Sequence, residues 1–187
     1  KIDNHRWNVL VCHRRFGKTV CMINHLIRSA LLSKLNNPRF AYIAPTFKQA
    51  KSIAWDYMKQ FTAKIPHTKF NETELRVDLP NGSRITLLGS ESPDGLRGIY
   101  LDGCVIDEYA NVNSKLFPEI IRPALSDRKG YCVFIGTPMG MNNNFYELYQ
   151  HAQGAEDWFN YKAKASDTKI VDDDELVKAK EVMGEKK

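Results

Sequence analysis

Cys12-His13-Arg14-Arg15-Phe16-Gly17-Lys18-Thr19 is the most informative segment of this chain of 187 residues. It follows residues 8–12 (NVLVC), a short β-branched run with the pattern of a buried strand. It opens residues 18–33, where apolar side chains recur at helical spacing. A GKT sequence between a strand and a helix is the context that a phosphate-binding loop requires. The sequence therefore predicts a P-loop on an α/β sheet.

The atoms of this loop suit the binding of a nucleoside triphosphate. Lys18 carries a point charge for the β- and γ-phosphate oxygens, and the Thr19 hydroxyl is a ligand for Mg²⁺. Gly17 allows the backbone to approach the phosphates closely. Backbone N–H groups of the loop and of the helix N-terminus would surround the phosphates. The candidate nucleotide-binding residues are therefore His13, Arg14, Arg15, Phe16, Gly17, Lys18, Thr19 and Val20.

The loop departs from the full P-loop signature at one position. Cys12 stands where GxxxxGK[ST] has its first glycine, and the interior of the loop is strongly basic. A chance GKT turn on a basic surface is the alternative, so the neighbouring motifs have to support the interpretation.

A second motif, residues 104–108 (CVIDE), places two carboxylates directly after an apolar run. In a parallel α/β sheet, ligands bind at the carboxyl ends of the strands, so these side chains should meet the triphosphate. We expect Asp107 to hold Mg²⁺, partly through water, and Glu108 to act as general base for the attacking water. The alternative is a solvated acidic turn that caps the next helix.

A third motif follows the buried run 131–135 (YCVFI), which ends in Gly136-Thr137-Pro138. A small polar side chain at the tip of a central strand can sense the γ-phosphate, which makes Thr137 the candidate coupling residue. An ordinary strand-ending turn is the alternative, since Gly and Pro are common there.

The rest of the chain alternates short apolar strands with amphipathic helices. This order predicts an α/β fold whose mainly parallel central sheet is flanked by helices in three layers. A hairpin is expected around Pro80-Asn81-Gly82-Ser83, where alternating runs flank a turn. The other expected elements are strands at 40–44 and 158–165 and helices at 47–63 (with Thr46 as N-cap), 115–125, 144–150 and 172–183.

The composition narrows the class of protein but does not indicate a function. With 43% apolar and 26% charged residues, the chain fits one globular domain, and no apolar run approaches the roughly 18–20 residues of a membrane span. The formal net charge of +5 permits a polyanionic partner, although many soluble domains carry as much. The cysteines do not have metal-site spacing, and three of the four lie in apolar runs, which favours a reducing, intracellular setting; they are Cys12, Cys21, Cys104 and Cys132.

Taken in order, the motifs resemble the N-terminal ATPase domain of the large terminase subunit of tailed bacteriophages. The resemblance covers roughly residues 9–150, and it implies a RecA/ASCE-like P-loop fold and Mg²⁺-dependent ATP hydrolysis. The matching segments are HRRFGKT (13–19), AYIAPTFKQAK (41–51), GLRG (95–98), VIDEYA (105–110) and IGTP (135–138).

The resemblance also implies residue roles. The family assigns the same roles as the motifs do to five residues, namely Lys18, Thr19, Asp107, Glu108 and Thr137. Arg14 matches a loop arginine that contacts phosphate or responds to the nucleotide state; a plain surface charge is its alternative. Arg97 matches a proposed arginine finger that would complete a neighbouring subunit's catalytic site; an intrachain ion pair is its alternative.

The family further implies partners and a location. These are double-stranded DNA, the portal protein, the small terminase subunit and further copies of the chain in a ring, expected to be a pentamer, with no membrane partner. The place would be the host cytoplasm, with transient docking on the procapsid. Basic side chains are the candidates for DNA contact, and a solvated surface charge is the alternative for each of them: Lys48, Lys51, Arg122, Arg128, Lys162 and Lys164.

The expected organisation is an ATPase domain at 1–154, followed by an edge element and linker at 155–187. Because the chain opens on Lys1 and has no room for the nuclease that follows in the family, we expect an excised ATPase domain without nuclease activity. The family's adenine-contacting segment lies upstream of the loop, so Trp7 is a candidate to stack on the base, or simply packs on the first strand. The acidic run 172–175 is expected to be a solvated helix start.

Two other functions remain open at this level. A helicase-like nucleic-acid translocase shares the P-loop, the acidic pair and the Pro-Thr segment, but it needs a second lobe. A nucleotide-binding assembly module without hydrolysis is the other alternative. Glu108 argues against it, because binding alone requires no base.

Overall fold

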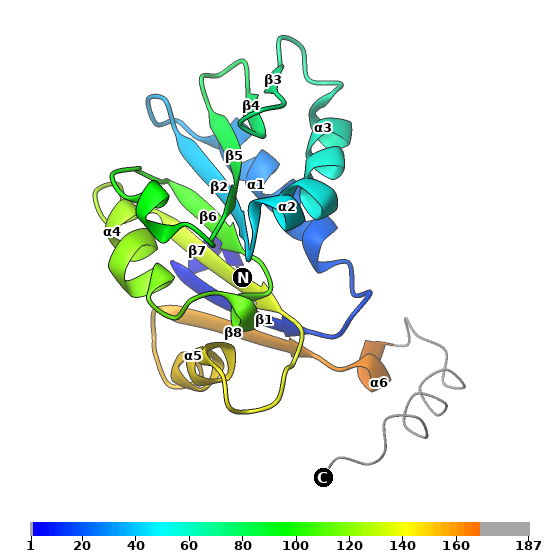
Figure 1. The fold of residues 1–187 in the computed structure, drawn as a ribbon, viewed down its shortest axis with the longest axis vertical. Helices are drawn as coiled ribbons and strands as arrows, with labels where there is room; N and C mark the ends of the chain where they lie inside the picture. The colour runs from blue at the N-terminus through cyan, green and yellow to red at the C-terminus, as the bar shows by residue number, and fades with distance from the viewer. Residues whose placement is uncertain (1, 169–187) are drawn as a thin grey trace.

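The computed structural model describes residues 2–168, which form an α/β fold around one eight-stranded sheet (Figure 1). The strand order is β3-β4-β5-β2-β6-β7-β1-β8. Six consecutive strands of this order, from β5 to β8, run parallel to one another. The predicted mainly parallel sheet is therefore confirmed. The strands are β1 (Trp7–Cys12), β2 (Arg39–Ala44), β3 (Lys69–Asn71), β4 (Arg76–Asp78), β5 (Arg84–Gly89), β6 (Gly103–Ile106), β7 (Tyr131–Gly136) and β8 (Trp158–Ala163).

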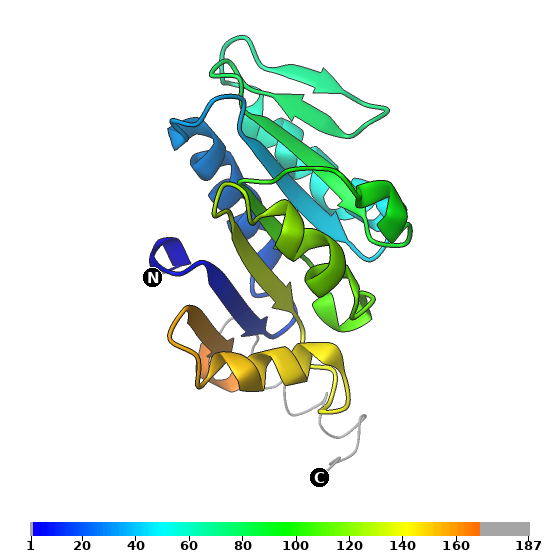
Figure 2. The ribbon, with the colours of Figure 1, turned by 90° about the vertical axis from the view of Figure 1, so that its left-hand side faces the viewer.

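Helices cover both faces of the sheet, which gives the predicted three layers (Figure 2). One face packs against α1 (Lys18–Leu32) and against the helix formed by α2 (Phe47–Ala50), η2 (Lys51–Trp55) and α3 (Asp56–Thr62). The other face packs against η5 (Phe117–Ile121) and α5 (Asn144–Ala152). The short elements are η1 (Ile2–Asn4), η3 (Pro93–Leu96), η4 (Tyr109–Asn111), α4 (Arg122–Ala124) and α6 (Ala165–Thr168).

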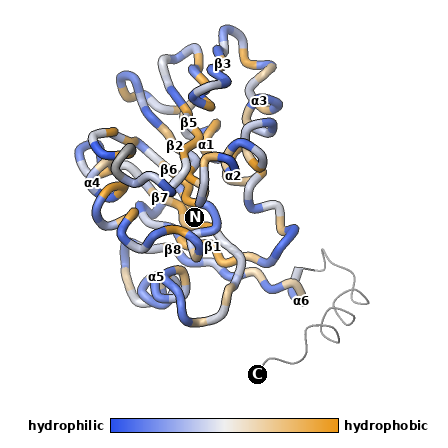
Figure 3. The backbone as a smooth tube through the Cα atoms, in the orientation of Figure 1, coloured by the Kyte–Doolittle hydropathy of each residue, from blue (hydrophilic) through white to orange (hydrophobic). Residues whose placement is uncertain are grey.

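The hydrophobic central strands explain why the sheet forms the core. All six residues of β1 are buried, as are all four of β6 and five of six in β7. The tube view shows these strands in the hydrophobic colour and the outer loops in the hydrophilic one (Figure 3). Strands that are covered on both faces carry continuous apolar runs, which is the pattern expected for a parallel sheet.

Two predicted helices form with a wider turn than the α-helix has. The helix expected at 47–63 begins at the predicted cap, where the Thr46 hydroxyl accepts from the Gln49 amide at 3.1 Å, but its middle, η2, is π-helical. The helix expected at 115–125 is π-helical in η5 and continues into α4. Pro123 explains part of the second departure, because it has no N–H to donate to the preceding turn.

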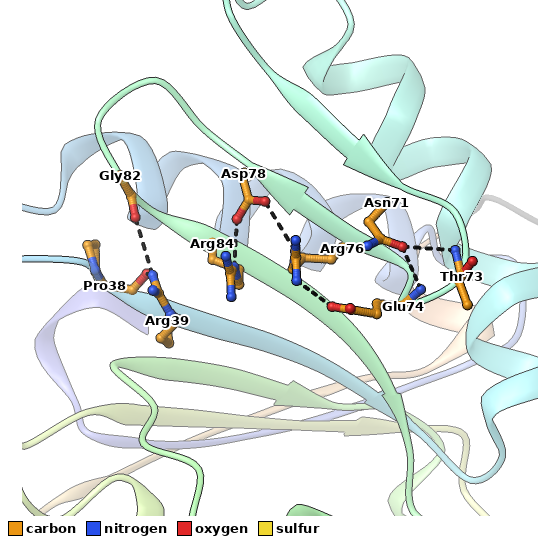
Figure 4. Close-up of polar contacts among 9 residues, drawn as sticks. All are labelled: Pro38, Arg39, Asn71, Thr73, Glu74, Arg76, Asp78, Gly82 and Arg84. Carbon is orange, nitrogen blue, oxygen red and sulfur yellow. Dashed lines mark hydrogen bonds and ion pairs between the residues drawn. The ribbon is translucent and has the colours of Figure 1, made fainter.

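The predicted hairpin is confirmed as β4 and β5, with Val77 opposite Ile85, and β3 adds an antiparallel strand that the sequence did not predict. Gly82 supplies the turn's positive φ of 83°. Charged side chains line one face of the hairpin: Asp78 accepts from Arg76 at 3.1 Å and from Arg84 at 2.6 Å (Figure 4). Partly exposed pairs of this kind stabilise a sheet by no more than about 1 kcal/mol each.

The expected strand near residue 158 is β8, which pairs in parallel with β1 and forms an edge of the sheet. The helix predicted at 172–183 and the acidic run at 172–175 lie outside the described residues. Within residues 2–168, no helix combines the length and apolar composition needed to cross a bilayer.

Candidate functional site

The strand order brings the three sequence motifs together at one edge of the sheet. β6, β7 and β1 are neighbours and run parallel, so the residues that follow their carboxyl ends meet. The P-loop follows β1, Asp107 and Glu108 follow β6, and Thr137 follows β7. Motifs separated by up to 119 residues in sequence thus form one site, as the sequence predicted.

The backbone of the P-loop has two residues in the left-handed region. Gly17, directly before α1, has φ 81°, and Arg15 has φ 62°. No atom lies within 4 Å of a Cβ built on Gly17, so the backbone conformation, rather than a lack of space, makes glycine favourable there. Cys12, the departure from the signature, is the last residue of β1 and is buried, so it needs no glycine-like conformation.

A cleft of about 780 Å³ opens over this edge of the sheet. It confirms the convergence of five predicted residues from three motifs, namely Arg14, Arg15, Lys18, Glu108 and Thr137. Three further lining residues were not predicted: Asn111, Pro138 and Met139. Asn111 follows Glu108 by three residues in η4, a spacing of about one turn that offers a weak sequence signal.

Two predicted loop residues direct their side chains away from the cleft. The buried His13 ring contacts the Thr168 hydroxyl at 2.8 Å and the Arg14 carbonyl at 2.6 Å. The Phe16 ring lines a separate cavity beside α1. Any contact of these two residues with phosphate is therefore made by their backbone.

Lys18, Thr137 and Glu108 form a chain of polar contacts across the cleft. The Lys18 ammonium donates to the Thr137 hydroxyl and to the His13 carbonyl, both at 3.5 Å. The Thr137 hydroxyl donates to a Glu108 carboxylate oxygen at 3.3 Å. These distances are near the upper limit for hydrogen bonds, so phosphate oxygens can replace them at low cost. The candidate phosphate-binding, coupling and base residues are thus adjacent.

Glu108 has an unusual backbone conformation, with φ 45° and ψ 48°. For a non-glycine residue this left-handed conformation costs roughly 1–2 kcal/mol. Strain of this kind clusters at functional sites. Here it accompanies the contact of the Glu108 carboxylate with Thr137.

Asp107 is buried behind the cleft and is held by two donors. The Tyr42 hydroxyl donates a short hydrogen bond to one oxygen, and the Glu108 amide donates to the other at 2.8 Å. Burial raises the pKa of Asp107 and the Glu108 charge adds to this, while the Tyr42 hydrogen bond and the Lys18 charge oppose it. Tyr42 was not predicted, because it lies inside the apolar strand β2 and its partner is 65 residues away.

Tyr42 also links the two candidate metal ligands. Burial and the Asp107 charge raise the pKa of Tyr42, and a hydrogen bond with the Thr19 side chain works in the opposite direction. Thr19 and Asp107 therefore flank the same hydroxyl. A hydroxyl at the start of α1 and a carboxylate that follows β6, with phosphate and water completing the shell, would fit the oxygen ligands that Mg²⁺ prefers.

The structure gives different answers for Trp7 and Arg97. Trp7 is 7% exposed and packs edge-on against Phe117, so its predicted stacking on a base is wrong; it is a core residue that belongs to the first strand, β1, rather than packing against it. The Arg97 guanidinium lies 3.8 Å from the Glu119 carboxylate, and its side chain is 55% exposed. The ion pair expected as its alternative role is therefore present.

A family model described as "Terminase large subunit, T4likevirus-type, N-terminal" matches residues 11–182. The chain belongs to this terminase family. The large terminase subunit of Thermus phage G20c is 30% identical over an alignment of 126 residues, and the match covers 57% of this terminase chain and 26% of that protein. The large subunit of Thermus virus P23-45 matches to the same extent. The chain thus spans about a quarter of the length of these curated relatives.

Solved structures confirm the fold of this terminase domain. The large terminase ATPase domain of Thermus phage P74-26 has a TM-score of 0.78 at 21% identity, over 97% of this chain and 84% of that one. The large terminase of a thermophilic bacteriophage, solved in complex with ADP, has a TM-score of 0.78 at 16% identity, over 96% of this chain and 45% of that one. At these identities the likeness extends to the fold alone.

Proposed function

We propose that this chain is the ATP-hydrolysing motor domain of a large terminase subunit, with residues 1–154 as the ATPase unit. The observation that carries the proposal is the contact chain Lys18–Thr137–Glu108, which joins three separate motifs inside one cleft. Relatives of the same fold have been solved with ADP and with ATP-gamma-S, which supports nucleotide binding here. Membership of the terminase family favours this function over a helicase-like translocase.

Hydrolysis would proceed by in-line attack of water on the γ-phosphate. Glu108 orients the water and accepts its proton, while Lys18 and the loop N–H groups neutralise the developing charge. Thr19 and Asp107 would hold Mg²⁺, which when bound shields the charge of the β- and γ-phosphates. Glu108 in the cleft, beside Thr137, also counts against a module that only binds nucleotide.

Thr137 would couple the nucleotide state to movement. Its hydroxyl lies between Lys18 and Glu108, so a γ-phosphate at Lys18 changes the partners of Thr137. Thr137 begins the segment that connects β7 to α5. A change in its hydrogen bonds therefore acts on α5 and on the adjacent edge strand β8.

Arg97 would act in a neighbouring copy of the chain within a ring, expected to be a pentamer on the portal protein. Its exposed guanidinium lies on the η5 side of the fold through its Glu119 contact and does not line the cleft of its own chain. A finger delivered by another subunit would add a further arginine to a cleft that Arg14 and Arg15 of its own chain already line.

The motor would move double-stranded DNA into a procapsid, working with the small terminase subunit in the host cytoplasm. The basic candidates for DNA contact do not form one patch: Lys48 and Lys51 lie on the helix over one face, and Arg122 lies on α4 over the other. Arg128 is held by Asp102 at 3.3 Å, and Lys162 and Lys164 lie at the edge strand β8 and just after it.

The test is the ATPase rate measured against protein concentration, with and without double-stranded DNA. A motor that works in a ring predicts a rate that rises more steeply than linearly with concentration and is stimulated by DNA. A complete absence of Mg²⁺-dependent ATP hydrolysis under all of these conditions would contradict the proposal.

A further inference from the structure

Asn111 lines the phosphate cleft together with Glu108 but belongs to none of the three sequence motifs. Glu108 has a left-handed backbone and is followed by the 3₁₀ turn η4, in which the Asn111 amide donates to the Glu108 carbonyl at 2.8 Å. Side chains three residues apart in such a turn lie on the same side of it. The turn therefore presents a carboxylate and a carboxamide to the same cleft.

The turn that carries Asn111 is held in place by the core and by α5. The Tyr109 ring is buried and packs edge-on against Phe134, with centroids 4.9 Å apart. Val112 is buried too, and its carbonyl accepts from the Asn144 carboxamide at 2.9 Å. Asn111 lies between these anchors and is exposed. A side chain on a turn that packing and hydrogen bonds fix in this way is suited to a positioning task.

The cleft is rich in hydrogen-bond donors and poor in acceptors. Its three cationic side chains can only donate, which suits phosphate oxygens. Oxygen acceptors are present on three lining side chains, those of Glu108, Asn111 and Thr137. The Thr137 hydroxyl already donates to Glu108 and accepts from Lys18. Within the described part of the chain, no hydrogen bond occupies the Asn111 carboxamide.

An attacking water has two hydrogens, and each of them needs an acceptor. Glu108 accepts one. We propose that the Asn111 carboxamide oxygen accepts the other, so that Asn111 and Glu108 hold the water between them. The inference rests on the proposed hydrolytic site and adds a further catalytic residue to it.

The step balances without any proton transfer to Asn111. The water oxygen bonds to the γ-phosphorus while the bond from this phosphorus to the bridging oxygen breaks, which releases ADP. One hydrogen of the water passes to Glu108 as a proton. The other stays on the oxygen as a hydroxyl of the phosphate product, and it is this hydrogen that Asn111 accepts. Asn111 thus contributes orientation of the water.

The experiment measures kcat with ATP and the dissociation constant of ATP-gamma-S. Asn111→Ala lowers kcat about tenfold, the effect of one lost hydrogen bond. It leaves the affinity for ATP-gamma-S unchanged, because the cationic side chains still bind the phosphates. Asn111→Asp, which has the same shape and keeps an acceptor, retains a higher kcat than Asn111→Ala. Asn36→Ala, an exposed asparagine before β2 at the opposite end of the sheet, is the matched control and changes neither quantity.

A double variant separates this catalytic role from a structural one. If both side chains act on one water, adding Asn111→Ala to Glu108→Gln causes little further loss of rate, because the effects of groups that act as a unit are not additive. A structural role would slow the wild type and Glu108→Gln by the same factor. Equal factors would therefore overturn the inference.

Three results with the single variants would also overturn it. They are a wild-type kcat for Asn111→Ala, a loss of ATP-gamma-S affinity in that variant with kcat unchanged, which would make Asn111 a phosphate ligand, and a lower kcat for Asn111→Asp than for Asn111→Ala, which would make the carboxamide a donor. Glu108→Gln separates this failure from that of the proposed function. If Glu108→Gln hydrolyses ATP at the wild-type rate, the proposed site is wrong; if it is inactive while Asn111→Ala is fully active, only the role of Asn111 is wrong.

Discussion

At the scale of single residues, the buried tyrosine of β2 organises the site. The Tyr42 hydroxyl donates to Asp107, and the Thr19 side chain acts on the pKa of the same hydroxyl, so Tyr42 lies beside both candidate Mg²⁺ ligands. Asp107 remains costly to bury, because burial raises its pKa despite these partners. The folded state therefore buries a carboxylate whose charged form is stabilised better by water than by its surroundings in the protein. Such a cost is common where function opposes stability.

The free-energy cost of burying the Asp107 charge predicts that Asp107→Asn stabilises the metal-free protein. The pKa of Asp107 is higher in the folded than in the unfolded chain, so at neutral pH its ionised form lowers the free energy of unfolding. The neutral amide still accepts from Tyr42 through its oxygen, but its NH2 group cannot accept from the Glu108 amide, and the loss of this hydrogen bond offsets part of the gain. We expect the Tm to rise by roughly 2–4 °C for each ~1 kcal/mol gained, while ATP hydrolysis is lost.

The measurement is thermal unfolding at neutral pH in the presence of a chelator. The same comparison at about pH 3, below the ordinary pKa of an aspartate, is the control, because a protonated Asp107 carries no charge and the advantage of Asn should shrink. A lower Tm for Asp107→Asn at neutral pH would show that the carboxylate stabilises the fold.

At the scale of elements, the P-loop depends on one residue that joins β1 to α1. Gly17 has φ 81° and open space around its Cα, so an added methyl group meets strain in the backbone and no clash. We expect Gly17→Ala to lower the stability by roughly 1–2 kcal/mol. If the loop relaxes instead, the same strain appears as a roughly 5- to 30-fold loss of ADP affinity.

Unfolding and ADP titration of the same samples check this prediction. Gly154→Ala is the matched control, because Gly154 also has open space around its Cα but does not have a positive φ. Equal behaviour of the two variants would contradict the role given to the backbone of Gly17.

The elements also show what the sequence could and could not predict. β1, β2, β6 and β7 were predictable because buried strands of a parallel sheet are continuous apolar runs. β3 could not be predicted, since the strand has only three residues (KFN) and they are mostly exposed. The role of Tyr42 was hidden for another reason: its partner comes from another strand, so only the pairing of β2 with β6 reveals it.

At the scale of the whole molecule, a crossover positions the cavity beside α1 that the Phe16 ring lines. The chain passes from β7 through α5 to β8, which pairs with β1 and brings Tyr161 beside Phe16. The sequence predicted a strand here without any indication of a cavity, because the cavity forms only once β8 pairs with β1. On the other side of the fold, Arg97 pairs with Glu119 and does not line the cleft of its own chain.

The position of Arg97 predicts complementation between copies. Arg97→Ala and Glu108→Gln should each be almost inactive alone, because one lacks the finger and the other lacks the base. Mixing them should restore part of the ATPase activity, since the Glu108→Gln copy supplies its Arg97 to an intact neighbouring site. Arg122→Ala, another exposed arginine, is the control and should retain full activity in the absence of DNA. No gain on mixing, or full activity of Arg97→Ala alone, would contradict a role in trans.

The most direct test of the whole account is the ATPase activity of Glu108→Gln, measured together with its ATP affinity. Loss of a general base reduces the rate by about 10²–10⁴-fold. The account predicts a loss in that range, with ATP affinity close to that of the wild type because Lys18 and the loop are unchanged. Glu147→Gln, an exposed carboxylate on α5, serves as control and should hydrolyse normally. Hydrolysis by Glu108→Gln at the wild-type rate would contradict the assignment of this cleft as the catalytic site.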